Sequence, residues 1–149
     1  MIIDVLKLKQ EGKTSYDFAF EYQADNSLLS LPGAEFSGAV KVSGTAFIDG
    51  KDLNINFSVN YVLVGECSRC LESAVAKVNF PFEATFSLFP GEDVFLYKSG
   101  KADITPAVNE AILLSQPTVI YCKEDCKGLC PICGTNLNFS DCGHGTLSH

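Results

Sequence analysis

Basic residues are scarce in this sequence, which has 11 lysines and arginines against 18 aspartates and glutamates and a formal net charge of −7. Proteins that bind nucleic acid through its phosphates usually carry a concentrated basic patch. Lys123 and Lys127 come nearest to such a patch, but Glu124 and Asp125 beside them nearly cancel their charge. A broad electrostatic surface for RNA is therefore not expected, and any RNA contact has to be local or made through another protein.

Histidine is rarer still, with two copies, at positions 144 and 149. His144 lies among cysteines and is a candidate metal ligand, and His149 is expected to be solvated. No imidazole then remains for a Cys–His catalytic pair. The sequence also has no phosphate-binding glycine loop and no serine nucleophile motif. We therefore expect a protein that is not an enzyme.

Long apolar runs are missing as well. No segment approaches the ~18–20 apolar residues that a membrane-spanning helix needs. The N-terminal residues reach a carboxylate at Asp4 without building the apolar region of a signal peptide. The expected location is the cytoplasm, with no membrane contact. In that reducing compartment the seven cysteines favour metal binding over disulfides.

Apolar side chains, in contrast, are plentiful enough for a core. Hydrophobic residues make up 46% of the chain and charged residues 19%, and its 149 residues fit one domain with a small appendage. Four segments alternate apolar and polar residues with period two, the pattern of half-buried strands. They cover residues 16–22, 40–48, 53–61 and 78–88. One apolar and one polar face per strand predict a mainly β (α+β) fold, built on an antiparallel sheet or open barrel.

The connections between these segments also follow from the sequence. Asp49-Gly50 predicts a tight hairpin turn between the second and third strands. Cys67-Ser68-Arg69-Cys70-Leu71 falls at the tip of the hairpin formed by the third and fourth strands. Residues 26–33 and 90–101 are rich in turn residues and are expected to be loops.

One packed helix is predicted near residues 106–115. Thr105 is its expected cap, Pro106 suits its first position, and Pro117 prevents its continuation. We expect a β-rich body over residues 1–120 and a cysteine-rich, zinc-binding tail over residues 121–149. This tail is expected to dock on the 67–70 hairpin tip.

The tail contains the sequence Cys130-Pro131-Ile132-Cys133-Gly134. Two thiolates separated by two residues can chelate one ion from a tight turn whose backbone N–H groups point at the sulfurs. The glycine permits the positive φ angle with which the chain leaves such a turn. This pattern is typical of a zinc knuckle and predicts structural zinc.

A structural zinc ion takes four ligands, and the chain offers eight candidates, enough for one or two sites. In one partition, Cys142 and His144 complete the Cys130 knuckle and the other four cysteines form a second site. In another, Cys67 and Cys70 pair with the knuckle. The candidate ligands are Cys67, Cys70, Cys122, Cys126, Cys130, Cys133, Cys142 and His144.

Other uses of these cysteines remain open from the sequence. Thiolates also bind iron–sulfur clusters. Cys67 and Cys70 alone are compatible with unliganded thiols, or with a redox dithiol, although a dithiol of the thioredoxin kind needs a βαβ context and a helix N-terminus. A thiol redox or zinc-sensing switch is therefore the alternative function, and a zinc-dependent nuclease is less favoured.

The run from Cys122 to Asn138 resembles the YceD family, the large ribosomal RNA subunit accumulation proteins of bacteria and plastids. Cys67-Ser68-Arg69-Cys70-Leu71 is similar to the internal Cys-x-Arg-Cys element of that family, and the match runs from about Val62 to the end. Family tails usually close with Cys-x-Cys, where this chain has Cys142-Gly143-His144.

The resemblance implies a non-enzymatic role in ribosome biogenesis, supporting accumulation of 23S rRNA and large-subunit assembly, with structural zinc. The expected partner is the pre-ribosomal large subunit, reached through 23S rRNA or a basic ribosomal protein. No small-molecule substrate is expected. The cations nearest the cysteines, Arg69, Lys123 and Lys127, are the candidate partner-binding residues.

Overall fold

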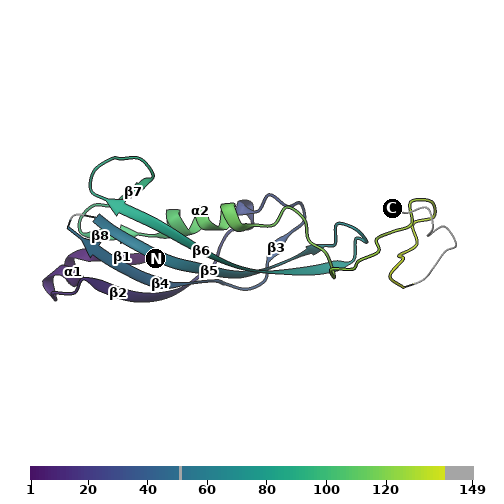
Figure 1. Ribbon diagram of the computed structural model, residues 1–149, viewed down its shortest axis with the longest axis horizontal. Helices are drawn as coiled ribbons and strands as arrows, with labels where there is room; N and C mark the ends of the chain where they lie inside the picture. The colour runs from purple at the N-terminus through teal and green to yellow at the C-terminus, as the bar shows by residue number, and fades with distance from the viewer. Residues whose placement is uncertain (51, 140–149) are drawn as a thin grey trace.

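The computed structural model describes residues 1–50 and 52–139. The molecule is elongated, with a curved sheet at one end and a tail of irregular structure extending from the other (Figure 1). Within the described part of the chain, no helix combines the length and the apolar character needed to cross a membrane.

The main sheet has six strands in the order β2-β4-β5-β6-β7, with β3 paired to β5. All pairs are antiparallel except β6 with β7, which is parallel. The prediction of an antiparallel sheet is confirmed. The strands are β2 Ser15–Tyr22, β3 Glu35–Phe36, β4 Val40–Asp49, β5 Asp52–Glu66, β6 Ser73–Ser87 and β7 Val94–Leu96.

The alternation seen in the sequence divides the sheet into two faces. On β5, the odd-numbered residues from Leu53 to Leu63 are buried, while their even-numbered neighbours are only half-buried or exposed. Aromatic rings pack on the buried face, for example Phe57 against Phe82 with ring centroids 5.7 Å apart. The main core therefore lies on one side of the sheet, and the other side carries the polar residues.

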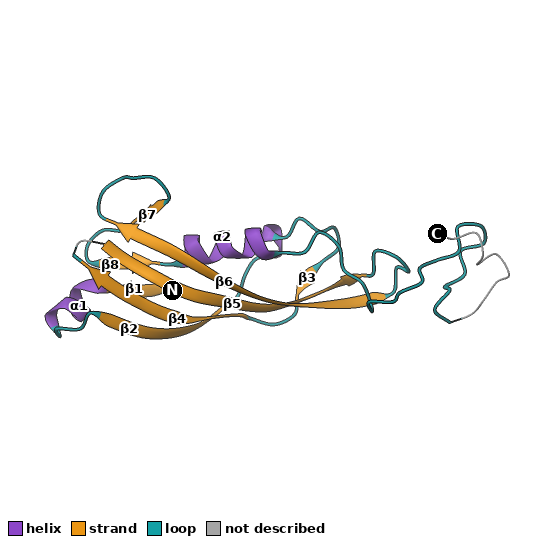
Figure 2. Cartoon of the chain, in the orientation of Figure 1, coloured by secondary structure: helices purple, strands orange, loops and turns teal. Residues whose placement is uncertain are grey.

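Helix α2, Thr105–Ser115, lies on the buried face (Figure 2). It buries Ala107, Val108, Ala111 and Ile112, and the Tyr61 hydroxyl and Ser115 Oγ are hydrogen-bonded at 2.7 Å. The helix was predicted within one residue, but its cap was predicted wrongly. Thr105 is already helical and Ile104 precedes it; the Asp103 carboxylate accepts the Thr105 N–H at 3.0 Å.

The N-terminal segment forms structure that its short patterns did not predict. Strand β1, Ile2–Asp4, pairs with β8, Lys101–Asp103, in a small second sheet, and helix α1, Val5–Gln10, follows β1 directly. Strand β7 and the start of β8 lie in the 90–101 segment, which was expected to be a loop. A short 3-10 helix, η1 Asn26–Leu28, lies in the expected 26–33 loop.

Candidate metal centre

The long β5–β6 hairpin ends in the turn that carries Cys67 and Cys70. The turn is closed by two backbone hydrogen bonds, from Cys67 N–H to the Glu72 carbonyl at 2.7 Å and from Leu71 N–H to the Cys67 carbonyl at 2.9 Å. Leu71 has a positive φ of 65°, which lets the chain turn back toward β6. Both cysteine side chains are buried at this tip.

The segment after α2 brings the tail to the same tip. Ser68 N–H donates to the Ile120 carbonyl at 2.7 Å, and Ile120 is itself buried. The Arg69 guanidinium donates to the Cys126 carbonyl at 3.0 Å and lies over the Tyr121 ring, 4.4 Å from its centroid. These contacts join residues 120–126 to residues 68–69.

As a result four cysteines from two distant segments meet. The sulfurs of Cys67, Cys70, Cys122 and Cys126 all lie within 4.8 Å of one another, and three of these residues are buried. The Cys67–Cys126 and Cys70–Cys122 sulfur pairs are each 3.6 Å apart. A tetrahedral ion with metal–sulfur bonds of about 2.3 Å holds its sulfurs about 3.8 Å apart. The four residues therefore fit the coordination sphere of a single metal ion.

Hydrogen bonds around the cluster divide the thiols into two kinds. Burial acts to raise the pKa of Cys67, but N–H groups of Cys70, Cys122 and Arg69 and the Cys126 thiol bring this pKa down to about 6. The pKa of Cys126 is lowered chiefly by the Asn138 side chain.

The other two thiols hold their protons more tightly. Burial and the neighbouring thiols raise the pKa of Cys122 to about 12. For Cys70, the Glu72 N–H acts to lower the pKa, but burial and the bonds with Cys67 and Cys126 leave it raised. A metal that binds all four residues as thiolates displaces these protons, so its binding is coupled to proton release.

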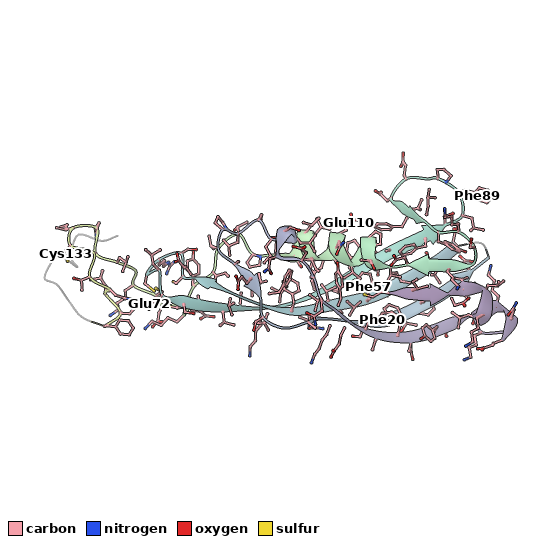
Figure 3. All side chains as sticks on the ribbon, turned by 180° about the vertical axis from the view of Figure 1, so that it is seen from behind. Phe20, Phe57, Glu72, Phe89, Glu110 and Cys133 are labelled. Atoms are coloured by element: carbon pink, nitrogen blue, oxygen red, sulfur yellow. The ribbon has the colours of Figure 1, made fainter. Side chains whose placement is uncertain are left out.

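The Cys130–Cys133 turn lies apart from this cluster. Ile132 N–H points at the Cys130 sulfur at 3.4 Å, and Gly134 N–H donates to the Cys130 carbonyl at 2.9 Å, as expected of a metal-binding knuckle. Cys133 lies toward the far end of the tail, well beyond Glu72 (Figure 3). Two further candidate ligands, Cys142 and His144, fall outside the described residues.

The three candidate partner-binding cations differ in their surroundings. Arg69 is engaged in holding the tail, through the contacts with Cys126 and Tyr121. The side chains of Lys123 and Lys127 are exposed next to the cysteine cluster. All three lie at the tip end of the molecule, as their places in the sequence suggested.

Sequence reasoning assigned no role to Asn138. Its side chain donates to the Cys126 sulfur at 3.4 Å and accepts the Lys127 N–H at 2.9 Å. The one sequence signal was its place at the end of the Asn136-Leu137-Asn138 run. Nothing in that run indicates a contact twelve residues back along the chain.

The fold and the cysteine cluster define the class of protein. It is a β-sheet protein with a long hairpin, in which the hairpin tip and the C-terminal tail each contribute two cysteines to one cluster. The chain matches the family model described as "Large ribosomal RNA subunit accumulation protein YceD" over residues 55–148. This segment begins within β5 and includes both the hairpin tip and the tail. The chain belongs to this family, and the resemblance drawn from its cysteine motifs is confirmed.

Several relatives are similar to the chain. The "Uncharacterized protein YlbN" of Bacillus subtilis is 30% identical over 137 residues, which cover 85% of this chain and 77% of the relative. The "Uncharacterized protein Rv2926c" of Mycobacterium tuberculosis is 33% identical over 89 residues, 54% of this chain and 42% of the relative. The "Uncharacterized protein ML1660" of Mycobacterium leprae is 28% identical over 95 residues, 58% of this chain and 44% of the relative. No solved structure shows a significant match to the chain.

Proposed function

We propose that this chain is a non-enzymatic ribosome biogenesis factor, which supports accumulation of 23S rRNA during large-subunit assembly in the cytoplasm. The family match over residues 55–148 carries this proposal, since the family is described by large ribosomal RNA subunit accumulation. The matched segment contains the four-cysteine cluster, so the tip is the part of the molecule that we assign to this role.

We further propose that the cluster binds zinc. Four thiolates at tetrahedral spacing form a closed structural zinc site. In a [4Fe–4S] cluster each cysteine binds a different iron atom, which requires sulfurs farther apart than the 3.6 Å of the two pairs here. Four protein ligands leave no position for a water nucleophile, and this argues against a zinc-dependent nuclease. Cobalt-substituted protein is expected to show a tetrahedral thiolate spectrum; an open, water-bound site would contradict the assignment.

A second zinc ion is proposed for the remaining candidate ligands, Cys130, Cys133, Cys142 and His144. This partition follows because Cys67 and Cys70 lie with Cys122 and Cys126 in the structure. Purified chain is then expected to contain two zinc ions, and one ion per chain would limit zinc to the four-cysteine cluster.

The partner is proposed to be the pre-ribosomal large subunit, contacted through 23S rRNA or a basic ribosomal protein. Lys123 and Lys127 are the cations to test first, because their side chains are exposed beside the cluster, whereas Arg69 holds the tail. Reversing both lysine charges with Lys123→Glu and Lys127→Glu is expected to weaken association with pre-ribosomal particles. Lys7→Glu with Lys9→Glu, on α1 at the opposite end, is the matched control.

The experiment that tests the function is depletion of the protein, followed by measurement of the 23S to 16S rRNA ratio and of precursor species. We expect a selective loss of 23S rRNA that the wild-type chain restores and that Cys126→Ser does not. An unchanged ratio in depleted cells would contradict the biogenesis role.

A thiol switch is the second candidate function, favoured by the two sulfur pairs at 3.6 Å. After metal loss, hydrogen peroxide can oxidise such a pair to a disulfide, with two thiols and one peroxide giving one disulfide and two waters. This function requires metal release at low peroxide concentrations. Slow, zinc-protected alkylation of Cys67 and Cys70 with no release of metal by peroxide would eliminate it.

A further inference from the structure

The Asn138 carboxamide lies where the tail folds back on the cysteine cluster, and both of its N–H donors and its oxygen are engaged in hydrogen bonds. Its nitrogen donates to the Cys126 sulfur at 3.4 Å and to Asn136 Oδ1 at 2.9 Å. Its oxygen accepts the Lys127 N–H at 2.9 Å. One side chain therefore contacts Cys126 of the four-sulfur cluster, the residue that follows Cys126, and Asn136 in its own segment of the tail.

The same side chain closes the loop that carries the Cys130–Cys133 turn. Leu137 N–H donates to the Gly128 carbonyl at 2.9 Å, and Leu129 is bridged to Asn136 in antiparallel fashion. Cys130 N–H also donates to the Thr135 carbonyl at 2.8 Å. Residues 127–138 thus form a closed loop that Asn138 fastens to Cys126 at its base.

The hydrogen bond from Asn138 to the Cys126 sulfur is not needed to close the loop. The bond with Lys127 already holds the two loop ends together, whereas the bond to the Cys126 sulfur connects the loop to the cluster. Donors to a ligating atom orient that atom and disperse its charge, and their loss typically weakens metal binding by about 10- to 100-fold. The half-buried position of Asn138 limits competition from water for this bond.

We propose that Asn138 is a positioning residue of the four-cysteine site, which fixes the Cys126 sulfur through its carboxamide N–H and couples the 127–138 loop to that site. The proposal rests on the metal binding proposed above. Loss of the bond frees the Cys126 sulfur to turn away, and the end of the loop that carries Cys130 and Cys133 then loses its side-chain contact with the cluster.

Asn138→Asp in the full-length chain separates the two roles of the side chain. Aspartate keeps an oxygen for the Lys127 N–H but has no N–H for the Cys126 sulfur or for Asn136 Oδ1, and it adds a negative charge beside a thiolate. Asn138→Ala removes all three side-chain contacts, including the one with Lys127. Asn79→Asp, an exposed position on β6, makes the same chemical change far from the cluster and is the matched control.

The measurements are zinc affinity by competition with a chromophoric chelator and the absorption spectrum of the cobalt-loaded chain. We expect Asn138→Asp to bind zinc about 10- to 100-fold more weakly than wild type. Its thiolate-to-cobalt charge-transfer band is expected at lower energy, because an undonated thiolate gives up electron density more easily. Asn138→Ala should be at least as weak, and Asn79→Asp should match wild type.

Two other outcomes would each contradict the proposal. Wild-type affinity and an unshifted band in Asn138→Asp, with weak binding only in Asn138→Ala, would assign Asn138 to loop closure alone. A wild-type chain that binds neither zinc nor cobalt would remove the metal site itself and this inference with it.

Discussion

The sulfur of Cys67 lies 3.6 Å from the sulfur of Cys126, although 59 positions separate the two residues in the chain. The pair therefore joins the tip of the β5–β6 hairpin to the tail that follows α2. A metal ion held between them would add to the Ser68–Ile120 and Arg69–Cys126 hydrogen bonds that join the two segments. Structural zinc contributes on the order of 10 kcal/mol in small zinc domains, so the docking of the tail should depend on it.

Loss of one ligand should expose the others at the same site. We expect Cys67→Ser to lower bound zinc and to make Cys122 and Cys126 react quickly with an alkylating agent, as read by mass spectrometry. Cys133→Ser, which changes a cysteine outside the cluster, should leave Cys122 and Cys126 protected. Equal protection in both variants would show that the four sulfurs do not share an ion.

Gly128 should be more sensitive to substitution than Gly134, although both have positive φ angles, of 78° and 76°. A Cβ on Gly128 would lie 3.3 Å from the Arg69 carbonyl oxygen, whereas a Cβ on Gly134 meets nothing within 4 Å. Both alanine variants carry the left-handed strain of roughly 1 kcal/mol, but only Gly128→Ala pushes the tail from the hairpin tip. Chelator competition should show weaker zinc binding at the cluster in Gly128→Ala than in Gly134→Ala; equal affinities would contradict the close contact.

Gly44 should be required for the packing of β4 on β5. A Cβ there would overlap the Asn56 carbonyl oxygen and lie 2.6 Å from Cα of Phe57, so Gly44→Ala forces the strands apart. We expect a loss of about 1–3 kcal/mol in the free energy of unfolding, measured by denaturant titration. Gly65→Ala, whose Cβ would make ordinary contacts of 3.5 Å or more, should change stability by less than about 1 kcal/mol.

The stability contributed by Asp103 should depend on pH. The hydrogen bond from the Thr105 hydroxyl, at 2.7 Å, is the main reason that the pKa of Asp103 is lowered from its ordinary value of 3.8. Since the pKa is lower in the folded state, the stabilisation is complete above the unfolded value and is lost as the pH falls through the folded value. Asp103→Ala should cost less than about 1 kcal/mol at pH 7, because the carboxylate is largely exposed and solvent screens its interactions.

The loss of stability in Asp103→Ala should become smaller in acid. Denaturant titrations of wild type and of Asp103→Ala from pH 7 to pH 2 measure this change. The difference between the two curves isolates Asp103 from other carboxylates, such as Asp25, that titrate in both proteins. A difference that stays constant down to the lowest pH would show that the carboxylate charge is not what stabilises the start of α2.

The central strands and α2 could be predicted because their signals are local. In β4, β5 and β6 the alternation of apolar and polar residues extends over many positions, and Pro106 and Pro117 bracket the helix. Strands β1, β7 and β8 have three residues each, too few for a period to be visible. Their existence depends on partners far away in the chain, as when Ile3 pairs with Ala102.

The candidate site also has features that could be predicted from the sequence and features that could not. The residue types and the Cys-x-x-Cys spacing indicated metal binding from the sequence and left two partitions of the ligands open. The structure groups Cys67 and Cys70 with Cys122 and Cys126, and this grouping depends on how the tail returns to the hairpin. That return is directed by the contacts of Ile120 with Ser68 and of Arg69 with Cys126, and the sequence does not reveal these pairings. The role of Asn138 is hidden for the same reason, because it arises only when the 127–138 loop has closed.

The β5–β6 hairpin also makes this small protein unusually long. Each of its strands has 15 residues, and a rise of about 3.3 Å per residue makes the hairpin roughly 50 Å long. A chain of this size packed into a ball would be only about 40 Å across. The wide end of the sheet and the hairpin tip that carries the cysteine cluster can therefore contact surfaces that are too far apart for a compact protein of equal mass. The chain should also elute from a sizing column ahead of globular standards of its mass.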